Sequence, residues 1–248
     1  MKSAERIDKL LVDRGLAVSR ARAQAMIMAG IVLADEKRIE KPSETVSSIS
    51  VIRIKGDDPE SKYVSRGGLK LEAALRHFHI APSEYVCLDV GSSTGGFTDC
   101  LLKYGAAKIV AVDAGTNQLV WALRSDCRVE VRENTNARYM TPGDFDVPFD
   151  LAVIDVSFIS VSKVLPAVVP LLGPNGRVIV LIKPQFEVGR GEVGKGGIVK
   201  DPAKHERVVR EVEETAVSLG LYPIGVIESP ILGAEGNKEF LAYYERRA

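Results

Sequence analysis

The stretch at residues 86–102, VCLDVGSSTGGFTDCLL, constrains the fold more than any other part of the chain. It begins with a short apolar run through Asp89 and ends in an amphipathic, helix-like pattern from Phe97. Between the two lies a turn with three glycines, Gly91, Gly95 and Gly96. This order predicts a strand, a turn and a helix, which places backbone N–H groups and a helix N-terminus at the carboxyl end of the strand. The spacing Gly-x-x-x-Gly-Gly differs from that of a dinucleotide-binding turn, so the stretch predicts a nucleotide-like ligand without identifying it.

Strand and helix patterns alternate from residue 63 onward. Apolar runs typical of strands occupy residues 86–90, 109–112, 129–132, 150–154, 177–182, 224–228 and 240–244. Helical patterns fall at residues 69–79, 96–104, 116–124, 161–171 and 203–219. The alternation predicts an α/β fold, with an open, mostly parallel sheet of seven strands and helices on both faces. The last two runs indicate a hairpin whose final strand lies antiparallel between its neighbours.

The first part of the chain has a different pattern. Two short helical segments are followed by small strand-like runs, at residues 7–14, 19–30, 31–34 and 49–54. We expect a small α+β domain over residues 1–56, a polar, proline-containing linker at 57–62, and a larger domain over 63–248. Residues 1–55 carry 11 Lys and Arg against 7 Asp and Glu, although the whole chain has a net charge of zero. An anionic partner would therefore meet a local basic patch.

Arg20 and Arg22 lie at the start of the second helical segment, where the helix dipole disfavours cations by about 0.3–1 kcal/mol each. A partner phosphate would compensate, because the same helix end offers free N–H donors. The alternative is a solvated basic face with salt bridges to Asp8 or Asp13. Spacing alone leaves both interpretations open.

Polar residues close four strands of the predicted sheet, where ligands of such sheets bind. Asp113 could accept hydrogen bonds from both hydroxyls of a ribose. Glu133 and Asn134 close the next strand, at a position where they could contact the amino group of an adenine. Asp155 and Lys183 close the next two strands. One such carboxylate alone is more often a loop cap, but four polar strand ends predict an adenosine-type cofactor. S-adenosylmethionine fits better than a nicotinamide, which would favour a tighter glycine turn and gives Lys183 no role. The predicted cofactor-binding residues are Asp89, Gly91, Ser92, Ser93, Gly95, Gly96, Phe97, Asp113, Glu133, Asn134 and Asp155.

Four residues far apart in the sequence resemble the Lys-Asp-Lys-Glu tetrad of the FtsJ-like ribose 2′-O-methyltransferases: Lys70, Asp155, Lys183 and Glu239. Almost the whole chain resembles the TlyA (haemolysin A) family of rRNA 2′-O-methyltransferases. The motifs that carry this resemblance are YVSRGGLKL at 63–71, DVGSSTGGFTDCLL at 89–102, DVSFIS at 155–160 and KPQFEVGRGEVGKGGIV at 183–199. The first domain is similar to the S-four-type RNA-binding domain, through Arg6-x-Asp8-x-x-Leu11, Ser19-Arg20-x-x-Ala23 and Ile27-x-x-Gly30-x-Val32.

The resemblance implies a Rossmann-like class I methyltransferase domain that transfers a methyl group from S-adenosylmethionine to cytidine riboses of ribosomal RNA. It implies rRNA or ribosomal subunits as partners and the tetrad as the catalytic residues. In this mechanism Asp155 holds Lys183, which either accepts the hydroxyl proton or, charged, stabilises the developing alkoxide. Lys70 and Glu239 orient this pair and the ribose. The predicted RNA-binding residues are Arg6, Arg20, Arg22, Arg66, Arg190 and Lys195.

Several residues allow two interpretations. The glycine-rich segment 189–197 is either a mobile cover for bound RNA or simply disordered. Phe158 and Phe186 could stack on a flipped base, and core packing is at least as well supported. Trp121 is expected in the core. The three histidines are too scattered to bind a metal together, and the three cysteines lack metal-ligand spacing, so we expect no metal site.

Three other functions compete with rRNA methylation. They are a non-catalytic RNA-binding protein with a methyltransferase fold, a membrane-active haemolysin, and a nicotinamide oxidoreductase. No apolar run approaches the roughly 18 residues of a membrane span, and residues 1–10, MKSAERIDKL, lack the apolar core of a signal peptide. We therefore expect a cytoplasmic protein.

Overall fold

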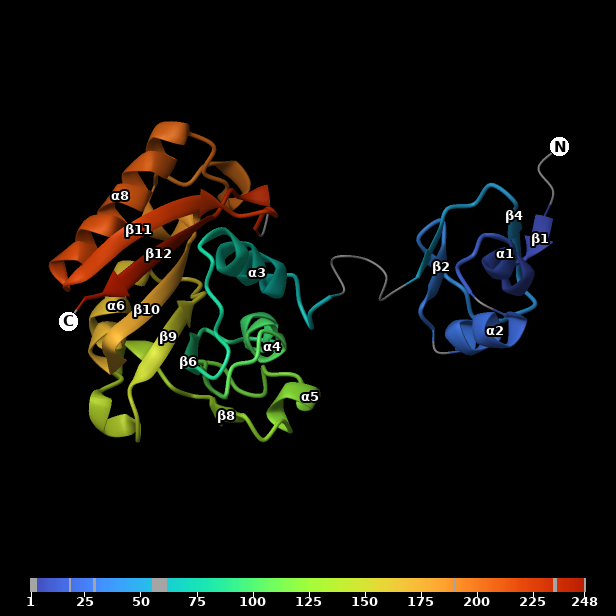
Figure 1. Ribbon diagram of the computed structural model, residues 1–248. Helices are drawn as coiled ribbons and strands as arrows, with labels where there is room; N and C mark the ends of the chain where they lie inside the picture. Colours follow the sequence, from blue (N-terminus) through green and yellow to red (C-terminus); the bar gives the residue numbers. More distant parts are fainter. Residues whose placement is uncertain are drawn as a thin grey trace. The chain divides into compact units, whose positions relative to one another are not determined.

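The computed structural model describes residues 4–17, 19–28, 30–54, 62–189, 191–233 and 236–247. The chain divides between Lys62 and Tyr63 into two compact units, and both are drawn in Figure 1. Except for Lys62, the predicted linker lies outside the described residues. Each unit is described by itself.

The larger unit is built on one seven-stranded sheet (Figure 1). Its strands are β6 (Val86–Val90), β7 (Lys108–Val112), β8 (Val129–Arg132), β9 (Phe149–Ile154), β10 (Leu172–Ile182), β11 (Leu221–Glu228) and β12 (Phe240–Arg246). They lie in the order β11-β12-β10-β9-β6-β7-β8. The pairs among β8, β7, β6, β9 and β10 are parallel, whereas β12 is antiparallel to both β10 and β11. The predicted fold class and the terminal hairpin are confirmed.

Two layers of helices cover the sheet. On one face α3 (Gly67–His77) and α4 (Gly96–Lys103) pack on the strands, and on the other face α6 (Leu165–Val168) and α8 (Pro202–Ser218) do so. The central strands are therefore buried on both sides, which explains why they are nearly continuous apolar runs. A short helix, α7 (Pro184–Glu187), follows β10 directly. Among the described residues, no helix is long and apolar enough to cross a bilayer.

The helix predicted over 116–124 is wrong for its first half, because α5 spans only Trp121–Arg124. The Glu133 carboxylate accepts hydrogen bonds from the backbone amides of Asn117 and Gln118, both at 2.8 Å, and holds this segment as a loop. Trp121 is 78% exposed, so its predicted place in the core is also wrong. Leu119 and Leu123, its neighbours in the loop and helix, face the core instead.

The helix predicted over 161–171 is also interrupted. It consists of two 3₁₀ turns, Val161–Lys163 and Val169–Leu171, on either side of α6. Pro170, which has no N–H group to donate, lies where the second turn replaces the α-helix.

The smaller unit contains two short helices, α1 (Ile7–Asp13) and α2 (Arg20–Met28), and two small sheets. Strands β3 (Lys37–Arg38), β2 (Val32–Ala34) and β5 (Ile52–Ile54) form one sheet, and β1 (Ala4–Arg6) pairs with β4 (Thr45–Ser47) in the other. The strand predicted over 49–54 is shorter than expected, because Ile49 and Val51 are exposed and lie before β5. The small α+β domain is confirmed.

Candidate active site

The glycine-rich turn connects β6 to α4, as predicted. Gly91 has φ +83°, and a Cβ there would lie 2.4 Å from the Asp155 carbonyl oxygen. Gly95, the N-cap of α4, has φ +102°, and a Cβ there would lie 2.3 Å from a Leu123 methyl group. Both positions therefore require glycine for conformation and for space. Gly91 brings the turn against Asp155, which follows β9, and Gly95 brings it against Leu123 of α5.

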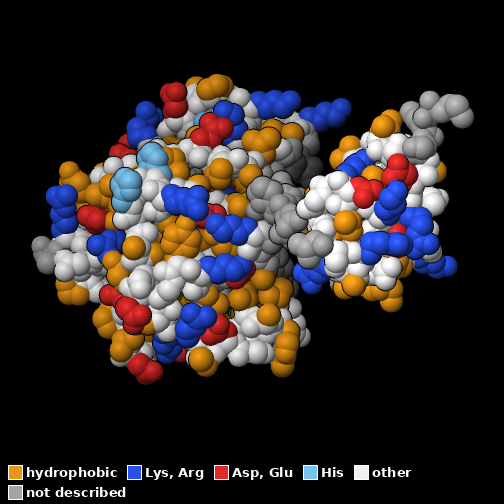
Figure 2. Space-filling model, turned by 45° about the vertical axis from the view of Figure 1, so that its right-hand side comes forward, with side chains coloured by type: hydrophobic (Ala, Val, Ile, Leu, Met, Phe, Trp, Pro, Cys, Tyr) orange, Lys and Arg blue, Asp and Glu red, His pale blue; other side chains and the backbone are white. Residues whose placement is uncertain are grey.

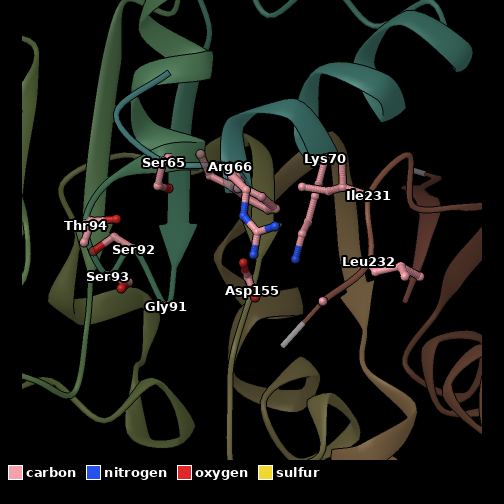
Figure 3. A pocket seen from close by; sticks show the side chains of 14 residues that line it. Ser65, Arg66, Lys70, Gly91, Ser92, Ser93, Thr94, Asp155, Ile231 and Leu232 are labelled. Atoms are coloured by element: carbon pink, nitrogen blue, oxygen red, sulfur yellow. The ribbon is translucent and has the colours of Figure 1, made fainter. Parts of the chain in front are cut away.

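Two cavities meet at this turn and share Gly91, Ser93 and Asp155. The first, which we call the polar cavity, has a volume of about 250 Å³. Its walls are Arg66 and Lys70 of the α3 region, Gly91–Thr94, Gly96 and Phe97 of the glycine turn, Asp155, and residues 231–233; Figure 3 shows most of these side chains. The second, the apolar cavity, has a volume of about 430 Å³ and includes Val90, Val112, Ile159 and Val164 in its walls.

The predicted cofactor residues divide into those that line the cavities and those that do not. Asp113 lines the apolar cavity, and its carboxylate accepts hydrogen bonds from the amides of Ser93 and Gly115, at 2.8 and 2.7 Å. The structure does not bring Glu133 and Asn134 to either cavity wall. Glu133 holds the 117–119 loop and the Arg124 guanidinium, and the Asn134 side chain accepts a hydrogen bond from the Thr116 hydroxyl.

Three residues directly after Asn134 line the apolar cavity in its place: Thr135, Asn136 and Ala137. The sequence did not point to them, because Glu133 and Asn134 are the polar residues nearest the strand end. Nothing in the sequence showed that the loop turns at Asn134, which has φ +53°.

Asp89 lies beneath the glycine turn and not in a cavity wall. It is fully buried, and the Thr98 hydroxyl donates to its Oδ2 at 2.6 Å. Its Oδ1 has no hydrogen-bond partner among the described residues. Burial raises the pKa of Asp89 to about 7. The carboxyl therefore ties β6 to α4 and fixes the helix that begins at the turn.

The four tetrad residues lie around the polar cavity as two ion pairs. Lys70 Nζ of α3 lies 2.5 Å from Glu239 Oε2, and the two side chains are 11% and 2% exposed. Glu239 precedes β12, so this pair joins α3 to the antiparallel strand across 169 residues of sequence. The carboxylate also packs tightly against Gly233, where a Cβ would lie 2.0 Å from Glu239 Oε1.

The second pair joins the ends of two adjacent strands. Lys183 Nζ, at the end of β10, lies 2.5 Å from Asp155 Oδ1, at the end of β9. Lys183 also donates a hydrogen bond to the Ser157 hydroxyl at 2.9 Å. Lys70 and Asp155 line the polar cavity directly, and each holds its partner of opposite charge behind it.

Two phenylalanines stand beside the second pair. Phe158 is 92% exposed, so core packing is excluded for it, and its ring lies 5.1 Å from that of Phe186. Phe158 has φ +64°, a conformation that costs a residue other than glycine about 1–3 kcal/mol. Its loop is held by Glu187, which accepts hydrogen bonds from the Ser160 hydroxyl and the Val161 amide, at 2.6 and 2.9 Å. An exposed aromatic ring on a fixed, strained loop is a surface on which a base can stack.

The glycine-rich segment 189–197 is fastened where the structure describes it. Glu192 forms an ion pair with Arg207 of α8 at 2.8 Å. Asn237, which is 2% exposed, donates to the Gly197 carbonyl at 2.9 Å and accepts from the Val199 amide at 3.0 Å. These contacts fasten the described part of the segment to α8 and to Asn237.

Of the predicted RNA-binding residues, Arg66 lines the polar cavity, Lys195 is exposed, and Arg190 lies outside the described residues. The other three belong to the smaller unit. Arg6 and Arg20 both donate to Asp8 Oδ2, each at 2.9 Å, so the predicted salt bridge of Arg20 to Asp8 is present. The hydrogen bonds from Arg6 hold the pKa of the buried Asp8 carboxyl well below its usual range.

Both guanidinium groups remain about half exposed, at 47% for Arg6 and 57% for Arg20. Arg22 is exposed as well. The salt bridges therefore orient the first two arginines without removing them from the surface, and Figure 2 shows Lys and Arg side chains grouped on this unit.

Comparison with known proteins agrees with this geometry. Residues 63–246 match the family of FtsJ-like methyltransferases, and residues 5–51 match the S4 domain. The chain belongs to the FtsJ-like methyltransferase family. The family resemblance seen in the sequence is thereby confirmed, as is the assignment of the chain as an enzyme of this class.

Individual relatives of this FtsJ-like methyltransferase cover most of its length. It is 46% identical over 243 residues to the 16S/23S rRNA (cytidine-2′-O)-methyltransferase TlyA of Mycobacterium tuberculosis (strain ATCC 25618 / H37Rv), covering 98% of this chain and 90% of that protein. It is 49% identical over 240 residues to a candidate rRNA methyltransferase, YqxC, of Bacillus subtilis (strain 168), covering 96% of this chain and 85% of that protein. A solved structure from Streptococcus thermophilus, described as a hemolysin candidate, superposes with a TM-score of 0.75 at 44% identity, covering 100% of this chain and 90% of that chain.

Proposed function

We propose that this protein transfers a methyl group from S-adenosylmethionine to the 2′-hydroxyl of cytidine riboses in ribosomal RNA. The observation that carries the proposal is the pair of lysine–carboxylate contacts around one cavity at the strand ends. The 46% identity to a protein named as a 16S/23S rRNA (cytidine-2′-O)-methyltransferase supports the choice of acceptor.

The residues of the two cavities fit S-adenosylmethionine. The apolar cavity has aliphatic walls for an adenine ring and the Asp113 carboxylate for a ribose. The polar cavity offers the glycine turn and the start of α4 to the amino-acid end. When bound, the cofactor supplies a methyl group activated by the positive charge of its sulfonium.

A ribose hydroxyl is a poor nucleophile, so the protein must orient it and ease the loss of its proton. We assign this task to Lys183, which either accepts the proton or, charged, stabilises the developing alkoxide. Asp155 holds Lys183 at 2.5 Å and is the carboxylate that faces the polar cavity. Lys70, fixed by Glu239, orients the ribose from the opposite wall.

The proposal includes RNA binding by both units. Arg6, Arg20 and Arg22 of an S4-type domain over residues 1–56 would contact phosphates, as would Arg66, Arg190 and Lys195 of the methyltransferase domain over 63–248. Phe158 would stack on the target base or its neighbour. We further propose that the protein acts in the cytoplasm, where its rRNA substrate is found.

Transfer of tritium from methyl-labelled S-adenosylmethionine to rRNA tests the proposal. Wild-type protein is expected to label isolated ribosomal subunits or naked rRNA, and Lys183→Ala is expected to lose transfer while keeping its affinity for S-adenosylhomocysteine. Lys238→Ala, an exposed lysine on the same edge of the sheet, serves as the control and should retain transfer. Transfer by Lys183→Ala at the wild-type rate would refute the role of Lys183.

A further inference from the structure

The charges around the polar cavity do not cancel. Two cations line it, Arg66 and Lys70, together with one anion, Asp155. Lys70 is bound to Glu239, and Asp155 is bound to Lys183. Arg66 has no ion-pair partner in the described ranges of the chain, so among these residues one positive charge of the cavity is left unbalanced.

The side chain of Arg66 is aimed into this cavity. Figure 3 shows its guanidinium group extending from the start of α3 toward Asp155, between the glycine turn and Lys70. No ion pair within 4.0 Å joins Arg66 to Asp155, although both line the same cavity. The guanidinium therefore extends into the cavity on the side of Asp155 without forming an ion pair with that carboxylate.

The backbone that carries Arg66 is rigidly attached to the cofactor turn. The Val64 amide donates to Asp99 of α4 at 2.9 Å, and the Tyr63 ring packs so closely against Gly68 that a Cβ there would lie 2.2 Å from it. A Cβ on Gly96 would lie 2.3 Å from the Ser65 hydroxyl. Arg66 thus has a fixed origin beside the first turn of α4, where the helix dipole also favours negative charge.

We propose that Arg66 is the anion-binding residue of the polar cavity and takes a carboxylate or a phosphate oxygen pair. A guanidinium group presents parallel N–H donors that match either group with two hydrogen bonds. The inference rests on the proposed function, in which two such anions reach this cavity. They are the α-carboxylate of the methyl donor and a phosphate next to the target ribose.

Three binding measurements on the full chain separate the two sources. Calorimetry is carried out with S-adenosylhomocysteine, with 5′-methylthioadenosine, which lacks the amino-acid end, and with a single-stranded oligocytidine of six nucleotides. Arg66→Gln removes the charge, and Arg66→Lys keeps the charge without the planar fork. Arg76→Gln, the same change at an exposed arginine near the other end of α3, is the matched control.

If the anion is the carboxylate, Arg66→Gln binds S-adenosylhomocysteine about 10- to 100-fold more weakly and binds 5′-methylthioadenosine as the wild type does. If the anion is the phosphate, both nucleosides bind normally and the oligocytidine binds about 10-fold more weakly, with a shallower dependence on salt. In either case Arg66→Lys should be intermediate and Arg76→Gln should match the wild type.

The inference is overturned if the affinities of the Arg66→Gln variant for all three probes lie within threefold of the wild-type values. Loss of all three affinities to the same degree would also overturn it, because that result indicates a general structural role. The proposed function fails separately, if wild-type protein binds S-adenosylhomocysteine no better than adenosine. If the proposed function fails in this way, the oligocytidine measurement still decides whether Arg66 binds a phosphate.

Discussion

Replacing Lys70 by methionine should destabilise the larger unit by about 3–5 kcal/mol, although only one side chain of similar length changes. The substitution leaves the Glu239 carboxylate, 2% exposed, without the ammonium group that lies 2.5 Å away in the wild type. Removing one partner of a buried ion pair costs this much because the remaining charge stays desolvated and unpaired. Glu239 also packs closely against Gly233, so its carboxylate has little contact with water of its own.

Urea unfolding of four proteins measures the effect: wild type, Lys70→Met, Glu239→Gln and the double variant. The double variant should be more stable than Lys70→Met, because the neutral amide no longer needs a cation. The coupling free energy between the two positions should reach about 2 kcal/mol, within the range measured for residues in contact. Lys238→Met is the control, since its pair with Glu228 is 51% exposed on both sides and should contribute no more than about 1 kcal/mol.

Two results would refute this reasoning. One is a cost below 1 kcal/mol for Lys70→Met, which would mean that the pair behaves as a solvated surface contact. The other is additivity of the two single changes within about 0.5 kcal/mol, which would mean that the two side chains do not interact.

Three further predictions concern other parts of the larger unit. Because burial raises the pKa of Asp89 to about 7, above the value near 4 in the unfolded chain, its contribution to stability is present at pH 4 and is lost as the pH rises through 7. Asp89→Asn, which can still accept from Thr98, should therefore flatten the dependence of unfolding free energy on pH, by about 3 kcal/mol between pH 5 and pH 8. An unchanged dependence in urea titrations at these two pH values would contradict this. Phe158→Leu should leave the melting temperature unchanged, because the ring is 92% exposed, and should raise KM for rRNA by about 5-fold or more through lost base stacking. An unchanged KM would remove Phe158 from the RNA surface. Asn237→Ala leaves the buried Val199 amide without its acceptor, so hydrogen exchange at residues 194–199 should accelerate, whereas exchange in β9 should stay as it is. Equal rates in both proteins would show that Asn237 does not hold this segment.

The sheet was predictable from the sequence because its strands are buried on both faces. Strands such as β6 and β9 have apolar residues at nearly every position, and polar residues mark where they end. Helices that pack one apolar stripe on the sheet, such as α8, were predicted to within one residue at each end.

Local competition for backbone hydrogen bonds was not predictable. The segment before Trp121 has a helical pattern, but the Glu133 carboxylate, 15 and 16 residues further along the chain than Gln118 and Asn117, captures the amides that would start the helix. No periodicity signals that a side chain from another strand will bind there. The same loss of helix turns Trp121 toward solvent, where a pattern-based analysis places a core residue.

The candidate site shows the same division. The tetrad could be identified because four residues resemble the Lys-Asp-Lys-Glu pattern of the family. Asp155 and Lys183 follow parallel strands and Glu239 precedes an antiparallel one, so the fold brings these three to one edge of the sheet. Which residues pair within the tetrad could not be predicted from the sequence, because Lys70 and Glu239 meet only through the docking of α3 beside β12. The inward direction of Arg66 also depends on that docking, and the sequence showed only a basic residue before a helix.

Locating the transferred methyl group tests the proposed ribose 2′-O-methylation directly. After reaction of wild-type protein with S-adenosylmethionine and ribosomal subunits, the rRNA is digested to nucleosides and analysed by mass spectrometry. We expect new 2′-O-methylcytidine, with the extra mass on the ribose, and none above background with Lys183→Ala. Methyl groups found only on bases, or no new methylated nucleoside with wild-type protein on either subunit, would contradict it.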